Sequence, residues 1–287
     1  MSVAQAIRDA AVTLAHTSDT ARLDAELLMA HALGCARSDV LLRHMQAEAP
    51  EGFGALVERR LAHEPVAYIV GHQEFYGLDL AVSPAVLIPR GDSETLIEAA
   101  QASLASRPPQ RILDLGTGSG ALLLAALSIW PSAEGIGIDR SPEALSIAAA
   151  NGARHAPQAR FMQADWTQTG WSDGLGLFDL ILANPPYVED AADLAPSVRA
   201  HEPAGALFAG PDGLDDYRLL IPQLRRLLAE NGIAMVEIGW TQAVPVTALA
   251  TAAEMTTVLH HDLAARPRAI EMAKNRNIPL GKAATDD

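Results

Sequence analysis

Residues 111–120 read Arg-Ile-Leu-Asp-Leu-Gly-Thr-Gly-Ser-Gly, and this stretch decides the fold. Residues 111–115 predict a strand, and a helical pattern follows from Gly120 to Ile129. Glycines at alternating positions let a chain turn sharply and approach a ligand closely. A strand, a glycine loop and a helix in this order therefore predict a ligand-binding turn in an α/β domain.

The segments that follow this loop alternate between strand and helix patterns. Further strands are expected at 135–139, 160–164, 178–183 and 233–238, with helices at 141–150 and 214–229. This alternation predicts a doubly wound, mainly parallel sheet. An apolar pair at 258–261 and 269–272 is expected to form a hairpin at its edge. From about residue 275 the chain is polar or small, and we expect disorder there.

Residues 1–72 lack the alternation and predict a small helical bundle. Residues 3–16 form the first expected helix, and a second places Leu23, Leu27 and Ala30 on one face before Gly34 ends it. Ser38 is expected to cap a third helix, and residues 50–61 to form a fourth.

A connector is expected at residues 73–91, followed by the larger domain at 92–287. The apolar alternation of residues 74–82 around a glycine predicts a β-hairpin. Asp92 or Ser93 is expected to cap the helix that begins the larger domain. The chain is thus divided into a helical domain, a hairpin connector and an α/β domain.

Composition is that of a soluble globular protein, with 49% hydrophobic and 20% charged residues among 287. The net charge of 21 − 35 = −14 argues against a protein that grips nucleic acid by its phosphates. Cys35, the only cysteine, excludes an intrachain disulfide and a cysteine-based zinc site, and we expect it to be buried. Without a signal pattern or an apolar run near about 18 residues, we expect a cytoplasmic location.

A donor site is predicted where the first two strands of the α/β domain end. Asp139 ends the second strand and is placed to bind both hydroxyls of a ribose. The spacing differs from a dinucleotide site, since Gly120 lies two residues after Gly118 and Asp114 two residues before Gly116. A carboxylate here disfavours a pyrophosphate and favours a cationic amino-acid group. S-adenosylmethionine carries such a group, together with a sulfonium that delivers methyl groups.

The other expected donor ligands lie in the loop and after the third strand. Thr117 completes the glycine loop, and Asp165 is expected to bind the adenine amino group while Trp166 flanks the base. The alternatives are a capping role for Asp165 and a core position for Trp166. Asn184 is expected to contact the donor as well as the acceptor.

An acceptor site is predicted after the strand at 178–183. Ala183-Asn184-Pro185-Pro186-Tyr187 offers a side-chain amide, two rigid residues without N–H groups and an aromatic ring. The Asn184 side-chain oxygen and the Pro185 carbonyl are expected to accept the two hydrogens of a flat –NH2 group, with Tyr187 packed on its face. Fixing both hydrogens orients a weak nucleophile without a strong base. The alternative is a proline turn with Asn184 as an ordinary turn residue.

Together the glycine loop, Asp139 and Asn-Pro-Pro-Tyr resemble a class I amino-methyltransferase. Further stretches narrow the resemblance to the release factor glutamine methyltransferase family. These are Arg22–Leu28, Glu64–Ile69, Gly71, Glu74–Phe75, Leu87–Arg90, Asp92–Glu94, Glu202–Pro203, Gly210–Asp215 and Glu237–Gly239. The resemblance runs from about Arg22 to Arg268, and Gly91 departs from it where the family usually has proline.

The resemblance implies a helical substrate-binding domain, a hairpin connector and a Rossmann-like seven-stranded methyltransferase domain. It implies transfer of the methyl group of S-adenosylmethionine to the side-chain amide nitrogen of the glutamine in the Gly-Gly-Gln loop of bacterial class I peptide chain release factors, in translation termination. S-adenosylhomocysteine is the expected product. Asn184, Pro185 and Tyr187 are the expected catalytic residues, and Pro186, Arg90 and Glu202 are expected to line the acceptor site, with salt bridging as the alternative for the last two.

The expected transfer is direct and in line, without a metal, a covalent intermediate or an obligatory general base. We expect a monomer with no stable nucleic-acid binding and no membrane association. The alternative enzyme methylates an exocyclic amine of adenine or guanine in nucleic acid, because the acceptor chemistry is the same. A non-enzymatic scaffold that binds the donor is the third reading, and the intact Asn-Pro-Pro-Tyr motif disfavours it.

Overall fold

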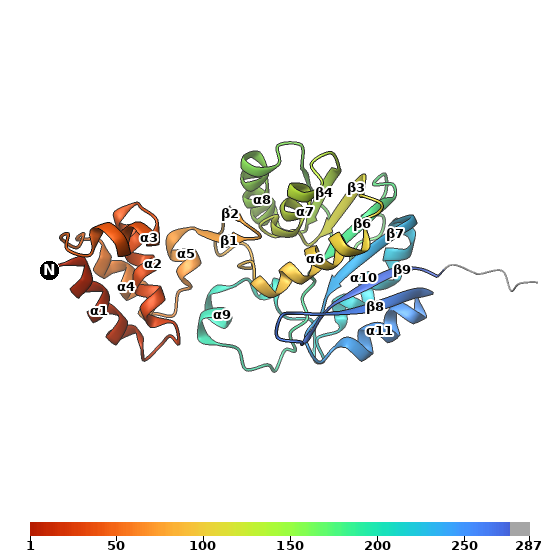
Figure 1. Cartoon of the computed structure of the whole chain (residues 1–287). Helices are drawn as coiled ribbons and strands as arrows, with labels where there is room; N and C mark the ends of the chain where they lie inside the picture. The colour runs from red at the N-terminus through yellow and green to blue at the C-terminus, as the bar shows by residue number, and fades with distance from the viewer. Residues whose placement is uncertain (276–287) are drawn as a thin grey trace, which may run out of the picture. The chain divides into compact units, whose positions relative to one another are not determined.

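The computed structural model describes residues 1–275 and divides the chain into two compact units (Figure 1). The first unit comprises Met1–Ile88 and Ala192–Ala206, and the second comprises Pro89–Ala191 and the chain from Leu207 onward. The three-part division made from the sequence stays a prediction. The disorder expected beyond about residue 275 lies outside the described residues. Within residues 1–275, no helix is long and apolar enough to cross a membrane.

The first unit is a helical bundle followed by a β-hairpin. Its core is formed by apolar side chains of the first two helices, packed against Val40, Phe53, Val57 and Ile69. The hairpin turns at Tyr76 and Gly77, whose φ angles of 51° and 77° are those of a type I′ turn. The elements are α1 (Val3–Leu14), α2 (Ala21–Leu33), α3 (Arg37–Asp39), the π-helical η1 (Val40–His44), α4 (Phe53–Leu61), α5 (Val66–Val70), β1 (His72–Phe75), β2 (Leu78–Ala81), α9 (Pro196–His201) and η3 (Ala204–Ala206).

The buried face of α2 differs from the one predicted. Leu23 is exposed and Leu27 is partly buried, whereas Ala30 is buried as predicted, and the helix also buries Ala25, Leu28 and Met29. Asp24 and Glu26 also lie at buried positions of α2. Their carboxylates are paired with arginines. Charged residues are therefore buried at positions that the apolar pattern predicts to be exposed to solvent. The predicted face was therefore right at Ala30 and wrong at Leu23.

Two other local predictions were wrong, and a third, the capping of α6, holds for the position but not for the side-chain bond. Ser38 lies inside α3, whose N-cap is Ala36, and it caps nothing. Cys35 is only partly buried, at the margin of the helical core. Ser93 stands at the N-cap of α6 (Glu94–Ser103), but its side chain makes no capping hydrogen bond because its hydroxyl binds elsewhere.

The second unit contains the predicted doubly wound sheet of seven strands, in the order β5-β4-β3-β6-β7-β9-β8. The first five strands in this order are parallel, whereas β9 pairs antiparallel with both β7 and β8. The remaining elements are η2 (Gly91–Ser93), β3 (Arg111–Leu115), α7 (Ala121–Ile129), β4 (Glu134–Asp139), α8 (Pro142–His155), β5 (Arg160–Gln163), β6 (Phe178–Ala183), α10 (Asp215–Leu227), β7 (Leu228–Glu237), α11 (Ala243–Ala252), β8 (Met255–His261) and β9 (Pro267–Lys274).

Helices cover the sheet in two groups (Figure 1). Contacts join α6 to α7 and α7 to α8, and others join α10 to α11. Successive residues of a strand point to opposite faces of the sheet, so alternate residues face the same group of helices. Leu113 and Leu115 of β3, for example, pack in one core with Tyr217, Leu220 and other residues of α10. Both faces of the central strands are therefore apolar, which explains their nearly continuous hydrophobic sequences.

Two adjacent arginines of α4 provide a test of the first unit. Arg60 pairs with Asp24 at 2.7 Å with both side chains largely buried, whereas Arg59 pairs with Glu64 at the surface. Arg60→Ala leaves a buried carboxylate without its cation and should cost about 3 kcal/mol of unfolding free energy. Arg59→Ala should cost about 1 kcal/mol or less.

Urea denaturation followed by helical circular dichroism measures both variants. Equal losses for the two arginines would contradict this assignment of the buried pair.

Candidate functional site

The register of the parallel strands aligns four strand ends in the second unit. Leu115 of β3 pairs with Ile138 of β4 on one side and with Ala183 of β6 on the other. Ala183 pairs in turn with Val236 of β7. The residues that follow, Gly116, Asp139, Asn184 and Glu237, therefore lie in one row across the carboxyl edge of the sheet. Ligands of open α/β sheets bind at such an edge, where neighbouring connections diverge.

The glycine loop joins β3 to α7 in a conformation that needs glycine. Gly116, Gly118 and Gly120 have φ angles of 71°, 55° and 86°. A Cβ on Gly116 would also come within 3.1 Å of the Trp166 ring. The loop is fixed from below by Thr117, whose backbone N–H donates to the Ile138 carbonyl at 2.8 Å. The backbone of the loop is thus held in a fixed position at the edge of the sheet, where a ligand can approach it closely.

Asp114 is buried directly under this loop. Its Oδ2 accepts a hydrogen bond from the Thr117 hydroxyl at 2.6 Å, and the backbone N–H of Leu123 also donates to the carboxyl group. Its Oδ1 is buried without a partner among the described residues. Burial, opposed by these two hydrogen bonds, raises the pKa of Asp114 to about 7. A buried carboxylate oxygen without a partner is better suited to bind a cationic group of a ligand than an anionic one.

Asp139 is held by two backbone N–H groups. Gly118 donates to its Oδ2 and Ser141 to its Oδ1, each at 2.9 Å. Each carboxylate oxygen keeps a further lone pair for a ligand hydroxyl. The two oxygens are therefore oriented for a bidentate contact of the kind that a ribose diol makes.

The residues after β5 have contacts that match both interpretations made from the sequence. Asp165 accepts hydrogen bonds from the backbone N–H and the hydroxyl of Thr167 through Oδ1, as a capping residue does. Trp166 packs against the core and donates its indole N–H to Asp216 at 3.1 Å. The same ring borders Gly116. Their roles toward a ligand stay a prediction.

The acceptor motif continues the row at the end of β6. Pro185 and Pro186 are buried, and Asn184 and Tyr187 are partly buried. The backbone N–H of Tyr187 donates to the Leu207 carbonyl at 3.2 Å, and its own carbonyl accepts from Gln242 Nε2 at 3.0 Å. These two hydrogen bonds hold the backbone of Tyr187 in place. The loop is therefore rigid enough to orient a small ligand, as a flexible turn would not be.

Polar residues behind this loop form a connected group. Asn184 Nδ2 lies 3.4 Å from the Ser93 hydroxyl, and Ser93 in turn hydrogen-bonds to the Glu237 carboxylate. The Tyr187 hydroxyl donates to Glu237 Oε1 at 3.2 Å. Burial raises the pKa of Glu237 to about 7, and burial with the nearby Glu237 charge raises that of Tyr187, so the phenol stays protonated.

Two residues that the sequence assigns to the acceptor site belong to different units. Arg90, in the second unit, is partly buried, and its charge lowers the pKa of Tyr187 against the larger effects of burial. Glu202, in the first unit, is buried, and its Oε2 accepts a hydrogen bond from the Ile88 backbone N–H at 3.2 Å. The acceptor role of each stays a prediction.

Sequence reasoning gave no role to several residues that hold the site. Gln242 and Arg268 carried no local signal. Asn151 of α8 holds the glycine loop through a bond to the Ser119 carbonyl at 2.9 Å. Glu237 did carry a signal, since it is an acid at the end of an apolar strand, as Asp139 is. The structure adds Glu237 and its contact Ser93 to the candidate site.

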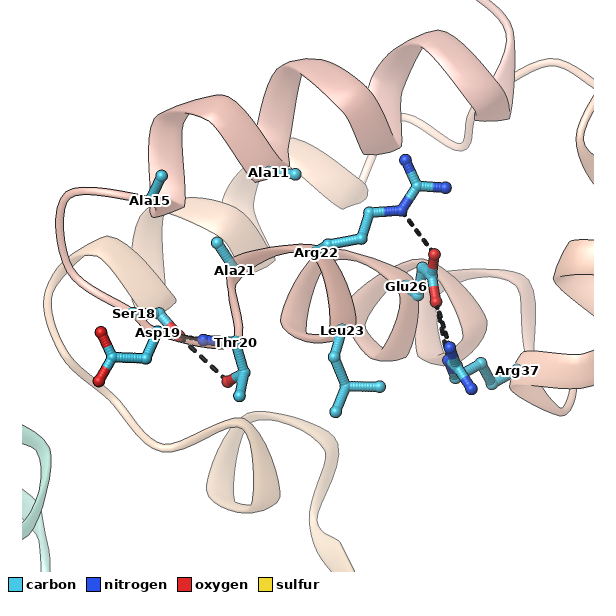
Figure 2. A pocket seen from close by; sticks show the side chains of 10 residues that line it. All are labelled: Ala11, Ala15, Ser18, Asp19, Thr20, Ala21, Arg22, Leu23, Glu26 and Arg37. Atoms are coloured by element: carbon cyan, nitrogen blue, oxygen red, sulfur yellow. Dashed lines mark hydrogen bonds and ion pairs between the residues drawn. The ribbon is translucent and has the colours of Figure 1, made fainter.

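A separate pocket of about 660 Å³ opens in the first unit, between the end of α1 and the start of α2 (Figure 2). Figure 2 shows Arg22 and Arg37 reaching Glu26 from two sides, with N–O distances of 2.5 and 2.6 Å. Burial tends to raise the pKa of Glu26, but the two arginines outweigh it and lower the pKa. None of the site residues predicted from the sequence lines this pocket.

Comparisons with known proteins agree on two regions. Residues 5–71 match the family model described as the PrmC N-terminal domain, and residues 107–278 match a methyltransferase domain. A protein of Caulobacter vibrioides named release factor glutamine methyltransferase is 38% identical over 265 residues, covering 90% of this chain and 91% of its own. One of the same name from Agrobacterium fabrum is 41% identical over 237 residues, covering 79% and 81%.

A solved structure supports the fold alone. A methyltransferase from Pyrococcus furiosus is 16% identical and aligns with a TM-score of 0.50 over 75% of this chain and 95% of its own.

The raised pKa of Asp114 predicts how stability varies with pH. The folded protein holds this proton more tightly than the unfolded chain, so the contribution is complete below the unfolded pKa near 3.8 and is lost as pH rises through about 7. Between pH 5 and 8 the ligand-free protein should therefore lose, relative to Asp114→Asn, on the order of 2–3 kcal/mol of unfolding free energy.

Chemical denaturation at several pH values measures this difference. Asp190→Asn, at an exposed aspartate, is the control and should follow the unsubstituted protein. A pH-independent difference between the protein and Asp114→Asn would show that Asp114 does not titrate in this range.

Proposed function

Since the chain belongs to the release factor glutamine methyltransferase family, we propose that it methylates the glutamine of the Gly-Gly-Gln motif in bacterial class I peptide chain release factors. The methyl group goes to the side-chain amide nitrogen. The observation that carries the proposal is the row of strand ends, in which the glycine loop and Asp139 stand beside Asn184. The methyl-donor site and the amide-binding site therefore lie next to each other at the same edge of the sheet.

The donor side of the row fits S-adenosylmethionine. Asp114, with an unpartnered buried oxygen, is suited to its ammonium group, and Asp139 to its ribose hydroxyls. Gly116, Thr117, Gly118 and Gly120 would supply backbone groups, and Asp165 and Trp166 would border the adenine. When bound, S-adenosylmethionine supplies a methyl group on a positively charged sulfur and leaves as S-adenosylhomocysteine.

The acceptor side orients a weak nucleophile. An amide nitrogen has a delocalised lone pair, so its geometry decides its reactivity. Asn184 Oδ1 and the Pro185 carbonyl would each accept one N–H hydrogen, and Tyr187 and Pro186 would pack on the planar amide. Carbonyl oxygens also stabilise the positive charge that grows on the nitrogen. The nitrogen then forms its bond to carbon and loses a proton to solvent.

The first unit is proposed to hold the folded substrate protein. Its match to the PrmC N-terminal domain and its polar-rimmed pocket support this assignment. Because release factors act on ribosomes, we place the enzyme in the cytoplasm, and we propose that it works as a monomer without stable nucleic-acid binding.

Transfer of labelled methyl from S-adenosylmethionine tests the function. A bacterial release factor should be labelled, and the same factor with its loop glutamine changed to alanine should not. The intact factor should also have a lower KM than a short peptide of the loop, because only the intact factor can contact the first unit. Label on both factors, or only on added RNA, would favour the nucleic-acid alternative.

Two substitutions separate the donor and acceptor sides. Asn184→Ala removes an acceptor for the reacting amide and should lower kcat by about 100-fold or more, with the Kd for S-adenosylmethionine within about threefold. Asp139→Ala removes two hydroxyl contacts and should raise that Kd by about 100-fold. Kinetics and calorimetry measure the two effects. A loss of donor affinity in Asn184→Ala equal to its loss of turnover would contradict this division.

A further inference from the structure

The hydrogen bonds behind the acceptor loop have a defined direction. An ionised carboxylate only accepts hydrogen bonds, so the single hydroxyl hydrogen of Ser93 is committed to Glu237. The Ser93 oxygen can then only accept from its other neighbour. That neighbour is Asn184, which places Nδ2 toward Ser93 at 3.4 Å. With Nδ2 committed, Oδ1 is the end of the amide available to a guest.

We propose that Glu237, acting through Ser93, is a positioning group that fixes the Asn184 side-chain amide with Oδ1 toward the reacting amide. The inference deepens the proposed function, because it concerns the same acceptor site. Without this direction the Asn184 amide can turn over, and Nδ2 would then meet the N–H groups of the guest. Two donors face to face repel, and the guest would lose an acceptor.

The surroundings hold the pair in place. Ser93 is 4% exposed and Glu237 is 2% exposed. Ser93 ends the short η2 turn, and Arg268 of β9 pairs with Asp92 of that turn at 2.9 Å. Arg268 is itself nearly buried. A salt bridge between the last strand and η2 therefore fixes the turn that carries Ser93.

Protonation of Glu237 would reverse the direction. The charged and titratable groups that face it are Arg268 of β9, Asp92 of η2, Tyr187 after β6 and Tyr217 of α10. Burial outweighs the Arg268 charge and raises the pKa of Glu237 to about 7. Once protonated, the carboxyl group can donate to Ser93, which frees the Ser93 hydrogen for Asn184 Oδ1.

Nuclear magnetic resonance of the ligand-free full-length protein tests the network without any methyl transfer. The Asn184 side-chain NH2 signals are assigned by their absence in Asn184→Asp. They should titrate with a midpoint near pH 7 in the unsubstituted protein, and this titration should vanish in Glu237→Gln and in Ser93→Ala. Asn184 NH2 signals that are the same in the unsubstituted protein, Glu237→Gln and Ser93→Ala at every pH between 5.5 and 8.5, or a titration that persists in Glu237→Gln, would overturn the proposal.

Kinetics with a release factor provide the second readout. Ser93→Ala should lower kcat about tenfold or more, with the Kd for S-adenosylmethionine nearly unchanged, since the hydrogen bonds that orient Asn184 are lost. Ser93→Thr keeps the hydroxyl and should recover most of the loss. The control is Ser103→Ala at the other end of α6, because Ser103 donates to Glu271 at 2.7 Å without touching the site.

The possible results are distinct. A full kcat in Ser93→Ala would overturn the positioning role, and so would parallel losses of kcat, Tm and donor affinity that Ser93→Thr does not restore. If the unsubstituted enzyme labels no release factor, the proposed function fails, while the titration of Asn184 still decides whether the network exists.

Discussion

The parallel register of β4, β3, β6 and β7 is the constraint on which the rest of the site depends. Hydrogen bonding between these strands brings Asp139, Gly116, Asn184 and Glu237 to one level, although they are spread over more than 100 positions of the sequence. A shift of one residue in any pair would turn the side chains of that strand to the other face. The chemistry of the edge is thus set by backbone pairing first and by side chains second.

Two buried carboxylates stand at this level with opposite surroundings. Asp114 has the negative charge of Asp139 nearby and one oxygen unpartnered, so a cation is the partner that suits it. Glu237 has hydroxyl donors and a nearby arginine, although its Oε2 is buried without a hydrogen-bond partner among the described residues. Burial raises both pKa values to about 7. A buried carboxylate can hence bind a ligand at Asp114 and orient a neighbouring side chain at Glu237.

Much of the second unit could be predicted because its signals are local. The ends of β3 and β6 follow from apolar runs that stop at a glycine or a proline, and each expected parallel strand is present. The face of α2 could not be predicted, because Asp24 and Glu26 are buried with arginines that come from other positions in the chain. Ser93 was misjudged for a related reason. Its position suits a cap, but its partners lie 91 and 144 residues away.

The position of β9 has a consequence for the synthesis of the protein. This strand, the last in the sequence of the described chain, lies between β7 and β8, which both precede it. It also carries Arg268, which holds the η2 turn. As the chain leaves the ribosome, β8 has no strand to pair with until β9 emerges, and the sheet stays open at β7. The nascent protein therefore acquires its finished acceptor loop only after β9 has been translated.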